Sequence, residues 1–301
     1  MSDAKYRGRL APSPTGYLHL GHARTFHRAW LRARESSGVL VMRMEDLDAD
    51  RSRPQYSNAA LEDLHWLGID WDEGPDVGGP FAPYEQSRRA HLYRAAWQRL
   101  REGEFIYPCR CSRKDLAAAL SAPHEDVRDS DGPRIHDPDD ELLYPGTCRP
   151  SRTGDGSLDL SPALADAPGG LNFRFRVPDG EAVEFHDAHL GPQRFIAGID
   201  FGDFLVWRRD GLPSYQLACV TDDFAMRITE VVRGADLLKS TARQILLNRA
   251  LGYPGPKWFH CELAVDENGR RLAKRHDSLS IRELRRKGLT AAEILSKGVS
   301  G

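Results

Sequence analysis

Several features that would restrict the class of this protein are missing from its sequence. No apolar run approaches the ~18 residues of a membrane-spanning helix, and residues 1–9 are too polar for a signal peptide. The five cysteines are an odd number, and Cys109 and Cys111 are separated by a single residue, so no disulfide framework is indicated. We therefore expect a cytoplasmic protein without a membrane contact.

The charge balance also argues against a large nucleic-acid-binding surface. The net charge of −2 over 301 residues provides no basic footprint for nucleic acid on the scale of the whole chain. Any nucleic-acid contact must then be local. The hydrophobic fraction of 40% and the charged fraction of 29% are typical of a globular protein with a sizeable core, long enough for two domains or for one domain with an insertion.

The rest of the chain is organised around residues 9–22, RLAPSPTGYLHLGH. Pro12 and Pro14 prevent continued strand pairing after Leu10, and Gly16 permits a tight bend. Apolar residues then recur at three- and four-residue spacing, which predicts a helix that begins near Gly21. A strand, a loop and a helix N-terminus in this order direct free backbone N–H groups and the positive end of the helix dipole at an anion.

Two histidines belong to this turn. His19 and His22 are three residues apart and could reach the same bound group, which favours a nucleotide phosphate. Residues 12–22, PSPTGYLHLGH, resemble the ATP-binding "HIGH" motif of class I aminoacyl-tRNA synthetases in its glutamyl form. The alternative is an ordinary strand–helix turn with incidental histidines.

The resemblance implies a fold and a set of roles. The fold is α/β, a Rossmann-like doubly wound parallel sheet with an inserted subdomain and a short helical C-terminal region. His19 and His22 would be catalytic, and the ATP-binding residues in this turn would be Pro12, Gly16, His19, Gly21 and His22.

Residues 39–46, VLVMRMED, are nearly continuous in apolar side chains, as a buried parallel strand should be. In doubly wound sheets, ligands lie beyond the carboxyl ends of the strands, so Glu45 should arrive beside the first loop. It could pair there with the amino group of a substrate. A solvated acid at the end of a strand is the alternative.

Two further helices are predicted in the first half, one after Pro54 that ends at Gly68 and one over residues 86–102. The arginines of the second, Arg89 among them, are expected to form a solvated face. In the second half, strands are expected over residues 172–177 and 228–236, with another before a turn at residues 210–211, and a helix over 236–251.

This second half resembles the corresponding part of the glutamyl synthetase catalytic domain. There, the matching Tyr215 and Arg233 belong to the amino-acid pocket. Without the resemblance, a packed core tyrosine and a surface arginine would be the simpler interpretations.

Apolar periodicity nearly vanishes between residues 121 and 170, which indicates an inserted, loop-rich subdomain. Such a segment has little core of its own, and the thiols of Cys109, Cys111 and Cys148 could hold zinc there. Tyr144, His136 or a water could supply the fourth ligand. Reduced, unligated cysteines are the alternative, and Cys219 and Cys261, far from the three in sequence, are taken as core residues.

The short relatives of glutamyl-tRNA synthetase, the glutamyl-Q tRNA(Asp) synthetase family, carry a Cys-x-Cys…Tyr-x-x-x-Cys zinc site. Cys109, Cys111, Tyr144 and Cys148 match that pattern. The resemblance therefore implies a bound Zn²⁺ with these four ligands.

Residues 270–276, RRLAKRH, correspond to the "KMSKS" loop of class I synthetases, with Arg271 and Ala273 in place of the first Lys and the Ser. Lys274 keeps the second Lys. A mobile lysine could follow the charge that develops on the ATP phosphates, so Lys274 is predicted to be catalytic and ATP-binding. A solvated basic loop is the alternative.

Together these residues describe a pocket for an acidic amino acid beside a nucleotide. Arg9 and Arg233 suit a bidentate grip on a carboxylate, and Glu45 suits an α-amino group. Ser13 and Tyr215 complete the expected glutamate site. The first step would be attack of the α-carboxylate on the α-phosphorus of ATP, and the family implies Mg²⁺ on the phosphates.

The expected organisation has four parts: residues 1–107 and 171–252 as the two halves of the catalytic domain, 108–170 as the zinc subdomain, and 253–301 as the KMSKS-like loop and helical region. Only 26 residues follow Arg275, so no anticodon-binding domain is expected. The resemblance then implies an enzyme that activates glutamate without tRNA and attaches it to queuosine in the anticodon of tRNA(Asp), and we expect it to be a monomer. The alternatives are a truncated glutamyl-tRNA synthetase that charges a tRNA 3′ end and a catalytically inactive, zinc-stabilised binding module.

Overall fold

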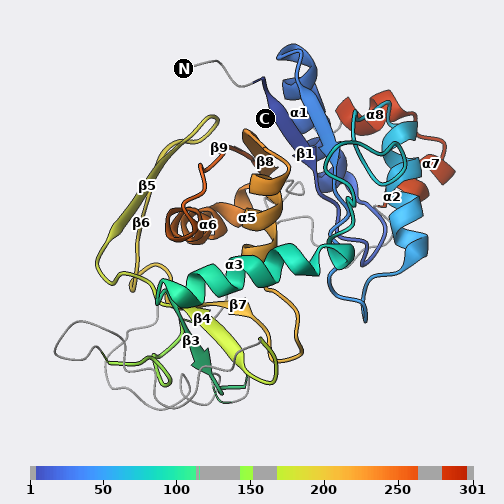
Figure 1. The fold of residues 1–301 in the computed structure, drawn as a ribbon. Helices are drawn as coiled ribbons and strands as arrows, with labels where there is room; N and C mark the ends of the chain where they lie inside the picture. The colour runs from blue at the N-terminus through green and yellow to red at the C-terminus, as the bar shows by residue number, and fades with distance from the viewer. Residues whose placement is uncertain (1–4, 113–114, 116–142, 152–167, 264–279, 297–301) are drawn as a thin grey trace.

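The structure is a computed structural model that describes residues 5–112, 115, 143–151, 168–263 and 280–296. Its first layer is a parallel sheet (Figure 1). Strand β1 (Arg7–Leu10) pairs in parallel with β2 (Val39–Met42), and β8 (Glu230–Gly234) pairs in parallel with β9 (Lys257–Cys261). Strand β1 also lies beside β8, where the Thr229 N–H donates to the Arg7 carbonyl. The predicted α/β class with a parallel sheet is confirmed.

A long hairpin extends this sheet. Strand β5 (Ala182–Asp187) meets β9 in parallel at Asp187 and pairs antiparallel with β6 (Gly191–Ile196), which gives the order β6-β5-β9-β8. Strand β9 was not predicted from the sequence. It lies within the stretch taken as the KMSKS-like loop and helical region, and its last residues border the predicted amino-acid pocket.

Helices cover the sheet. The buried residues of α1 (Leu20–Glu35) recur at three- and four-residue spacing, and α1 packs on β1 and β8. Helix α2 (Pro54–Trp66) begins with proline at its first position, where no N–H partner is lost. The short helices α7 (Ile281–Arg286) and α8 (Ala291–Ser296) bury Ile281 and Ile294 in the same core cluster as α1.

The helix predicted over residues 86–102 is divided in two. A 3₁₀ turn, η1 (Gln86–Arg88), precedes α3 (Ala90–Glu102), with the break at Arg89. The expectation of a solvated face is wrong for Arg89, which is 3% exposed. Its Nε donates to the carboxylate of Asp222 at 2.6 Å, because that buried acid requires a cation.

A second, antiparallel sheet lies across α3 from the parallel layer (Figure 1). It consists of β3 (Ile106–Cys109), β4 (Asn172–Phe175) and β7 (Phe204–Trp207). Its aromatic side chains pack against Trp97 of α3. Helices α5 (Tyr215–Ala225) and α6 (Leu238–Leu251) follow β7 and β8 and share this core.

In the part of the chain that the structure describes, no helix combines the length and the apolarity that crossing a membrane requires.

Candidate active site and zinc site

The predicted anion-binding turn joins β1 to α1. His19 is the N-cap of α1, and its backbone N–H donates to Nδ1 of His22 at 3.2 Å. The two imidazoles stack with 3.8 Å between their centroids. A Cβ on Gly21 would lie 3.1 Å from the His19 ring, so the close packing of this ring depends on glycine there. Both histidines are thus held at the start of the helix.

Glu45 lies beside this turn, as predicted. Its backbone N–H donates to the Pro12 carbonyl at 3.0 Å. Its side chain is only 7% exposed, so it is not a solvated acid. Oε1 accepts from Arg43 at 3.0 Å and from the Cys219 thiol at 3.4 Å, whereas Oε2 has no partner among the described residues. This second oxygen is available to a substrate ammonium group.

A buried ion network supports Glu45. Arg43 is fully buried and donates from Nη2 to Glu45 and from Nη1 to Asp223 at 2.6 Å. These two acids hold the pKa of the Arg43 guanidinium well above its usual value despite its burial. Asp223 also lies 3.7 Å from Nε of Arg9. The arrangement fixes the orientation of Glu45 and keeps Arg9 in an electrostatically balanced environment.

The two predicted arginines differ in what they can offer to a ligand. Arg9 donates from Nη1 to the Val232 carbonyl at 2.8 Å, the one hydrogen bond from its guanidinium to the described residues. Arg233 donates from all three of its nitrogens, to His260, Gln244, Thr241 and the Leu237 carbonyl. Arg9 therefore retains a free fork for a carboxylate, whereas Arg233 is held as a fixed donor.

His260 and Asp187 lie behind Arg233. Nδ1 of His260 is 2.6 Å from Oδ2 of Asp187, and both side chains are fully buried. Burial and the nearby Arg233 lower the pKa of His260 to about 4, so its imidazole is neutral near pH 7.

Tyr215 opens α5, four residues before Cys219, so both side chains lie on one face of that helix. Tyr215 is 37% exposed. Partial desolvation of its phenol and the neighbouring Cys219 and Glu45 raise the pKa of Tyr215, whereas Arg233 and Arg9 lower it. This places Tyr215 within electrostatic reach of the same pocket. Ser13 is exposed on the turn, where its carbonyl accepts from the Thr15 N–H.

The predicted zinc ligands also come together. The Sγ atoms of Cys109, Cys111 and Cys148 all lie within 4.8 Å of one another. The hydroxyl of Tyr144 is 3.5 Å from the Cys109 Sγ and 3.8 Å from the Cys111 Sγ. Sulfurs around a tetrahedral zinc are about 3.8 Å apart, so this donor set fits the metal. His136 lies outside the described residues.

Burial and the adjacent thiols raise the pKa of Cys111 to about 11, so this thiol would be neutral near pH 7 without a cation. Despite burial, hydrogen bonds from the Arg110 backbone and from Tyr144 lower the pKa of Cys148. Zinc would supply the positive charge that stabilises the thiolates and would join the end of β3 to residues 144–148.

Lys274 lies outside the described residues, and so does the rest of the KMSKS-like loop. The structure describes the chain again from Ser280, which forms an isolated antiparallel bridge with His19.

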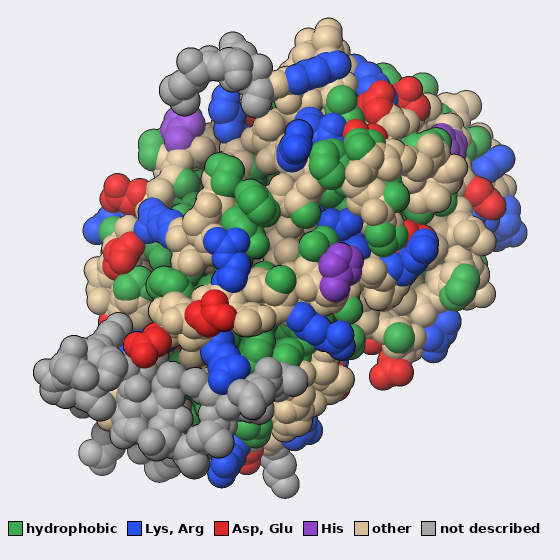
Figure 2. Space-filling view, in the orientation of Figure 1, with side chains coloured by type: hydrophobic (Ala, Val, Ile, Leu, Met, Phe, Trp, Pro, Cys, Tyr) green, Lys and Arg blue, Asp and Glu red, His purple; other side chains and the backbone are tan. Residues whose placement is uncertain are grey.

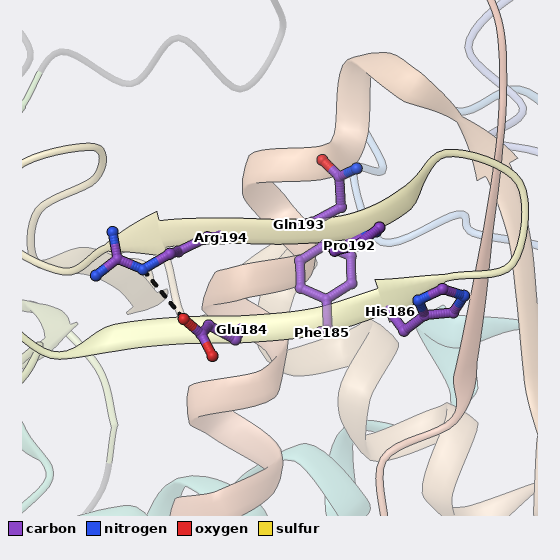
Figure 3. Close-up of a pocket in the computed structure, with 6 residues that line it drawn as sticks. All are labelled: Glu184, Phe185, His186, Pro192, Gln193 and Arg194. Carbon is purple, nitrogen blue, oxygen red and sulfur yellow. Dashed lines mark hydrogen bonds and ion pairs between the residues drawn. The ribbon is translucent and has the colours of Figure 1, made fainter.

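Among the described residues, the hollow along the β5–β6 hairpin and the charge pattern on one face of the molecule do not indicate a different site. A shallow hollow lies along the β5–β6 hairpin, where six side chains spread over both strands without converging and Glu184 pairs with Arg194 (Figure 3). On the face shown in Figure 2, lysine and arginine side chains are scattered among acidic and apolar ones.

Comparisons with known proteins agree with this geometry. The model of the class I tRNA synthetase (E and Q) catalytic domain matches residues 5–136 and 156–297. Glutamyl-Q tRNA(Asp) synthetase of Symbiobacterium thermophilum is 48% identical over 295 residues, an alignment that covers 96% of this chain and 84% of that protein. The chain belongs to the glutamyl-Q tRNA(Asp) synthetase family. The family predicted from the sequence is thereby confirmed.

Other relatives are less similar to this chain, and the chain covers a smaller share of their length. Glutamate–tRNA ligase of the same organism is 38% identical, over 96% of this synthetase and 56% of the ligase. The crystal structure of a glutamate tRNA ligase from Elizabethkingia meningosepticum in complex with its amino acid is 29% identical, with a TM-score of 0.73, over 95% of this chain and 54% of that one.

Four residues of the site were not found from the sequence: Arg43, Asp187, Asp223 and His260. Each acts through another side chain, and no local spacing connects them. One sequence signal could have indicated Arg43: it directly follows an apolar strand. A buried cation at that position requires acidic partners.

Proposed function

We propose that this synthetase activates L-glutamate with ATP to glutamyl-adenylate, without tRNA, and transfers the glutamate to queuosine in the anticodon of tRNA(Asp). The observation that supports this most directly is the position of Glu45. Its Oε2 has no partner among the described residues, and its backbone bonds to the turn that carries His19 and His22. Glu45, Arg9 and Arg233 all lie within electrostatic reach of Tyr215. One anion with two cations is the charge pattern that complements the single ammonium group and two carboxylates of glutamate.

The chemistry needs positioning more than a protein nucleophile. The α-carboxylate of glutamate attacks the α-phosphorus of ATP, a P–O bond forms, and pyrophosphate leaves with the electrons of the broken P–O bond. Backbone N–H groups at the start of α1, with His19 and His22, would hold the phosphates, and Lys274 would follow the leaving group. Mg²⁺ would neutralise phosphate charge.

In this proposal Arg9 binds a carboxylate of glutamate through its free fork and Arg233 donates one N–H. Glu45 accepts from the α-ammonium group, and Ser13 and Tyr215 border the same ligand. Cys109, Cys111, Tyr144 and Cys148 hold a structural Zn²⁺. The enzyme would act as a monomer in the cytoplasm, with a local contact to the tRNA(Asp) anticodon loop.

One alternative is charging of a tRNA 3′ end, as the name of the glutamate–tRNA ligase relative states for that protein. The higher identity to the glutamyl-Q relative from the same organism, 48% against 38%, favours the modification reaction. The other alternative, an inactive binding module, has no use for a buried Arg43 that orients Glu45, because a buried ion network carries a desolvation cost.

The test is ATP–pyrophosphate exchange with glutamate, with and without tRNA. Exchange without tRNA, followed by transfer of labelled glutamate to queuosine-containing but not queuosine-free tRNA(Asp), is the expected result. Exchange only in the presence of tRNA(Glu) would instead identify a charging enzyme. Failure of exchange under both conditions would contradict the proposal.

A further inference from the structure

The buried group behind Arg233 forms a hydrogen-bonded chain with a defined direction. Asp187 ends β5, His260 lies on β9 and Arg233 on β8, so three neighbouring strands bring the three side chains together. His260 lies between the other two, with Asp187 Oδ2 2.6 Å from its Nδ1 and Arg233 Nε 3.2 Å from its Nε2.

The two ends of the imidazole have different partners, and these fix its tautomer. Arg233 can only donate, so Nε2 of His260 must accept and carry no proton. Nδ1 then carries the proton and donates it to Asp187. The charges facing His260 are those of Asp187 and of Arg233 and Arg9, and burial with the two arginines keeps the ring neutral. Thr241, 3.0 Å from Nε2, is the other polar neighbour.

Asp187 is itself held in one orientation. Its Oδ1 accepts the backbone N–H groups of His189 and Leu190, at 3.0 and 2.9 Å, and both of its oxygens lie near the His260 N–H. Only Oδ2 is directed at the imidazole. The carboxylate is thus an acceptor on both sides, which an amide of the same shape could not be.

We propose that Asp187 and His260 are positioning residues for Arg233: they hold its Nε so that the guanidinium presents its remaining Nη1 N–H to glutamate. This rests on the proposed glutamate-binding function of Arg233. The hydrogen bonds from Arg233 through His260 to Asp187 fix the Arg233 guanidinium before glutamate binds. Binding therefore costs less side-chain entropy.

Replacement of Asp187 by Asn tests the direction of the hydrogen bonds that join Asp187, His260 and Arg233. The amide NH₂ cannot face the N–H groups of His189 and Leu190, so it must face Nδ1 of His260. The imidazole then moves its proton to Nε2, which opposes the Arg233 Nε–H. We expect the KM for glutamate in ATP–pyrophosphate exchange to rise about tenfold or more, with kcat nearly unchanged, because a ground-state contact is lost. Asp200→Asn is the matched control, since Asp200 accepts a backbone N–H near the same hairpin but is exposed.

A second pair of variants separates positioning from packing. His260→Gln places an amide oxygen where Nε2 lies and keeps an acceptor for Arg233. His260→Asn places its amide where Nδ1 lies and leaves Arg233 without that acceptor. Both change a fully buried residue, so both lose packing. We expect the KM of the Gln variant to stay within about threefold of the original and that of the Asn variant to rise about tenfold. Equal KM values for the two variants would overturn the proposal.

Long-range ¹H–¹⁵N spectra provide a readout that does not depend on catalysis. They should show the Nδ1–H tautomer for His260 and an exchange-protected Nε–H for Arg233, and Asp187→Asn should change both. An Nε2–H tautomer in the unmodified protein would overturn the proposal. If the unmodified protein fails to activate glutamate, the proposed function fails, and these spectra still decide whether Asp187 and His260 position Arg233.

Discussion

His19 and Ser280 pair their backbones in an isolated antiparallel bridge, and the adjacent Ile281 N–H donates to the Leu18 carbonyl at 2.8 Å. The N-cap of α1 is thereby joined to Ser280, four residues after the KMSKS-like loop ends at His276. Lys274, six residues before Ser280 in the sequence, lies outside the described residues.

The predicted catalytic role of Lys274 can be tested by mutation. Lys274→Met should lower kcat of ATP–pyrophosphate exchange about 100-fold, because a donor to the developing phosphate charge is lost, with a smaller change in the KM for glutamate. Lys287→Met is the control, since Lys287 is half-exposed at the end of α7 and contacts Glu283. An undiminished kcat for Lys274→Met would show that Lys274 is not catalytic and would support the alternative of a solvated basic loop.

Glu45 should determine recognition of the α-amino group. Glu45→Gln keeps the shape of the side chain and can still accept from Arg43, but it removes the negative charge. We expect the KM for glutamate to rise about 10- to 100-fold, the range for loss of a hydrogen bond to a charged group. Titration of glutamate in the exchange assay measures this, with the exposed Glu184→Gln as control. A KM within twofold of the original would remove Glu45 from the pocket.

The thiol cluster predicts metal content. Purified protein should contain about one zinc per chain, and Cys148→Ala should lose it because three donors hold zinc more weakly than four. Cys261→Ala should retain the metal, since Cys261 lies on β9 outside the cluster. Elemental analysis after dialysis measures both variants. If the folded protein contains no zinc, the zinc prediction is wrong and the three cysteines are unligated.

How much of the site is predictable from the sequence depends on whether a residue acts locally. The turn at His19 and His22 is indicated because prolines, glycines and helical periodicity adjoin in the chain. Glu45 is predictable because the carboxyl end of a buried strand has a known place in such sheets. Both positions agree with the structure, where Glu45 bonds to Pro12.

The supporting residues are not predictable in this way. His260 follows aromatic residues on a short strand, and nothing near it in sequence indicates Asp187 or Arg233 as a partner. Arg89 is misassigned because its charge indicates a surface residue, although it lies four residues before the buried Tyr93, and the tertiary contact with Asp222 explains its burial. Local sequence patterns indicate the residues that we propose to contact glutamate and ATP, whereas the hydrogen bonds that orient these side chains join distant strands.

His260 should make the stability of the protein depend on pH in a defined window. Its pKa is lowered to about 4 in the folded protein and is 6.5 when exposed. Above pH 6.5 the ring is neutral in both states and the stabilising contribution is fully present. As the pH falls from 6.5 to 4, the unfolded chain binds a proton that the folded protein does not, so the free energy of unfolding falls by about 1.4 kcal/mol per pH unit.

Over that window the loss is on the order of 3 kcal/mol. The pKa of Asp187 is also lowered, but its titration falls below this range. Urea unfolding at pH 7.5, 5.5 and 4 measures the free energy for the unmodified protein and for His260→Gln, in which that position does not titrate. Other acids, including Asp63, whose pKa burial raises to about 6, titrate in both proteins and cancel in the difference. The difference in stability between the two proteins should therefore shrink by about 3 kcal/mol as the pH falls from 7.5 to 4. A constant difference would mean that His260 has the same pKa in the folded and unfolded states, so that its ring would become protonated in the folded protein near pH 6.5 and Nε2 could not accept from Arg233 below that pH.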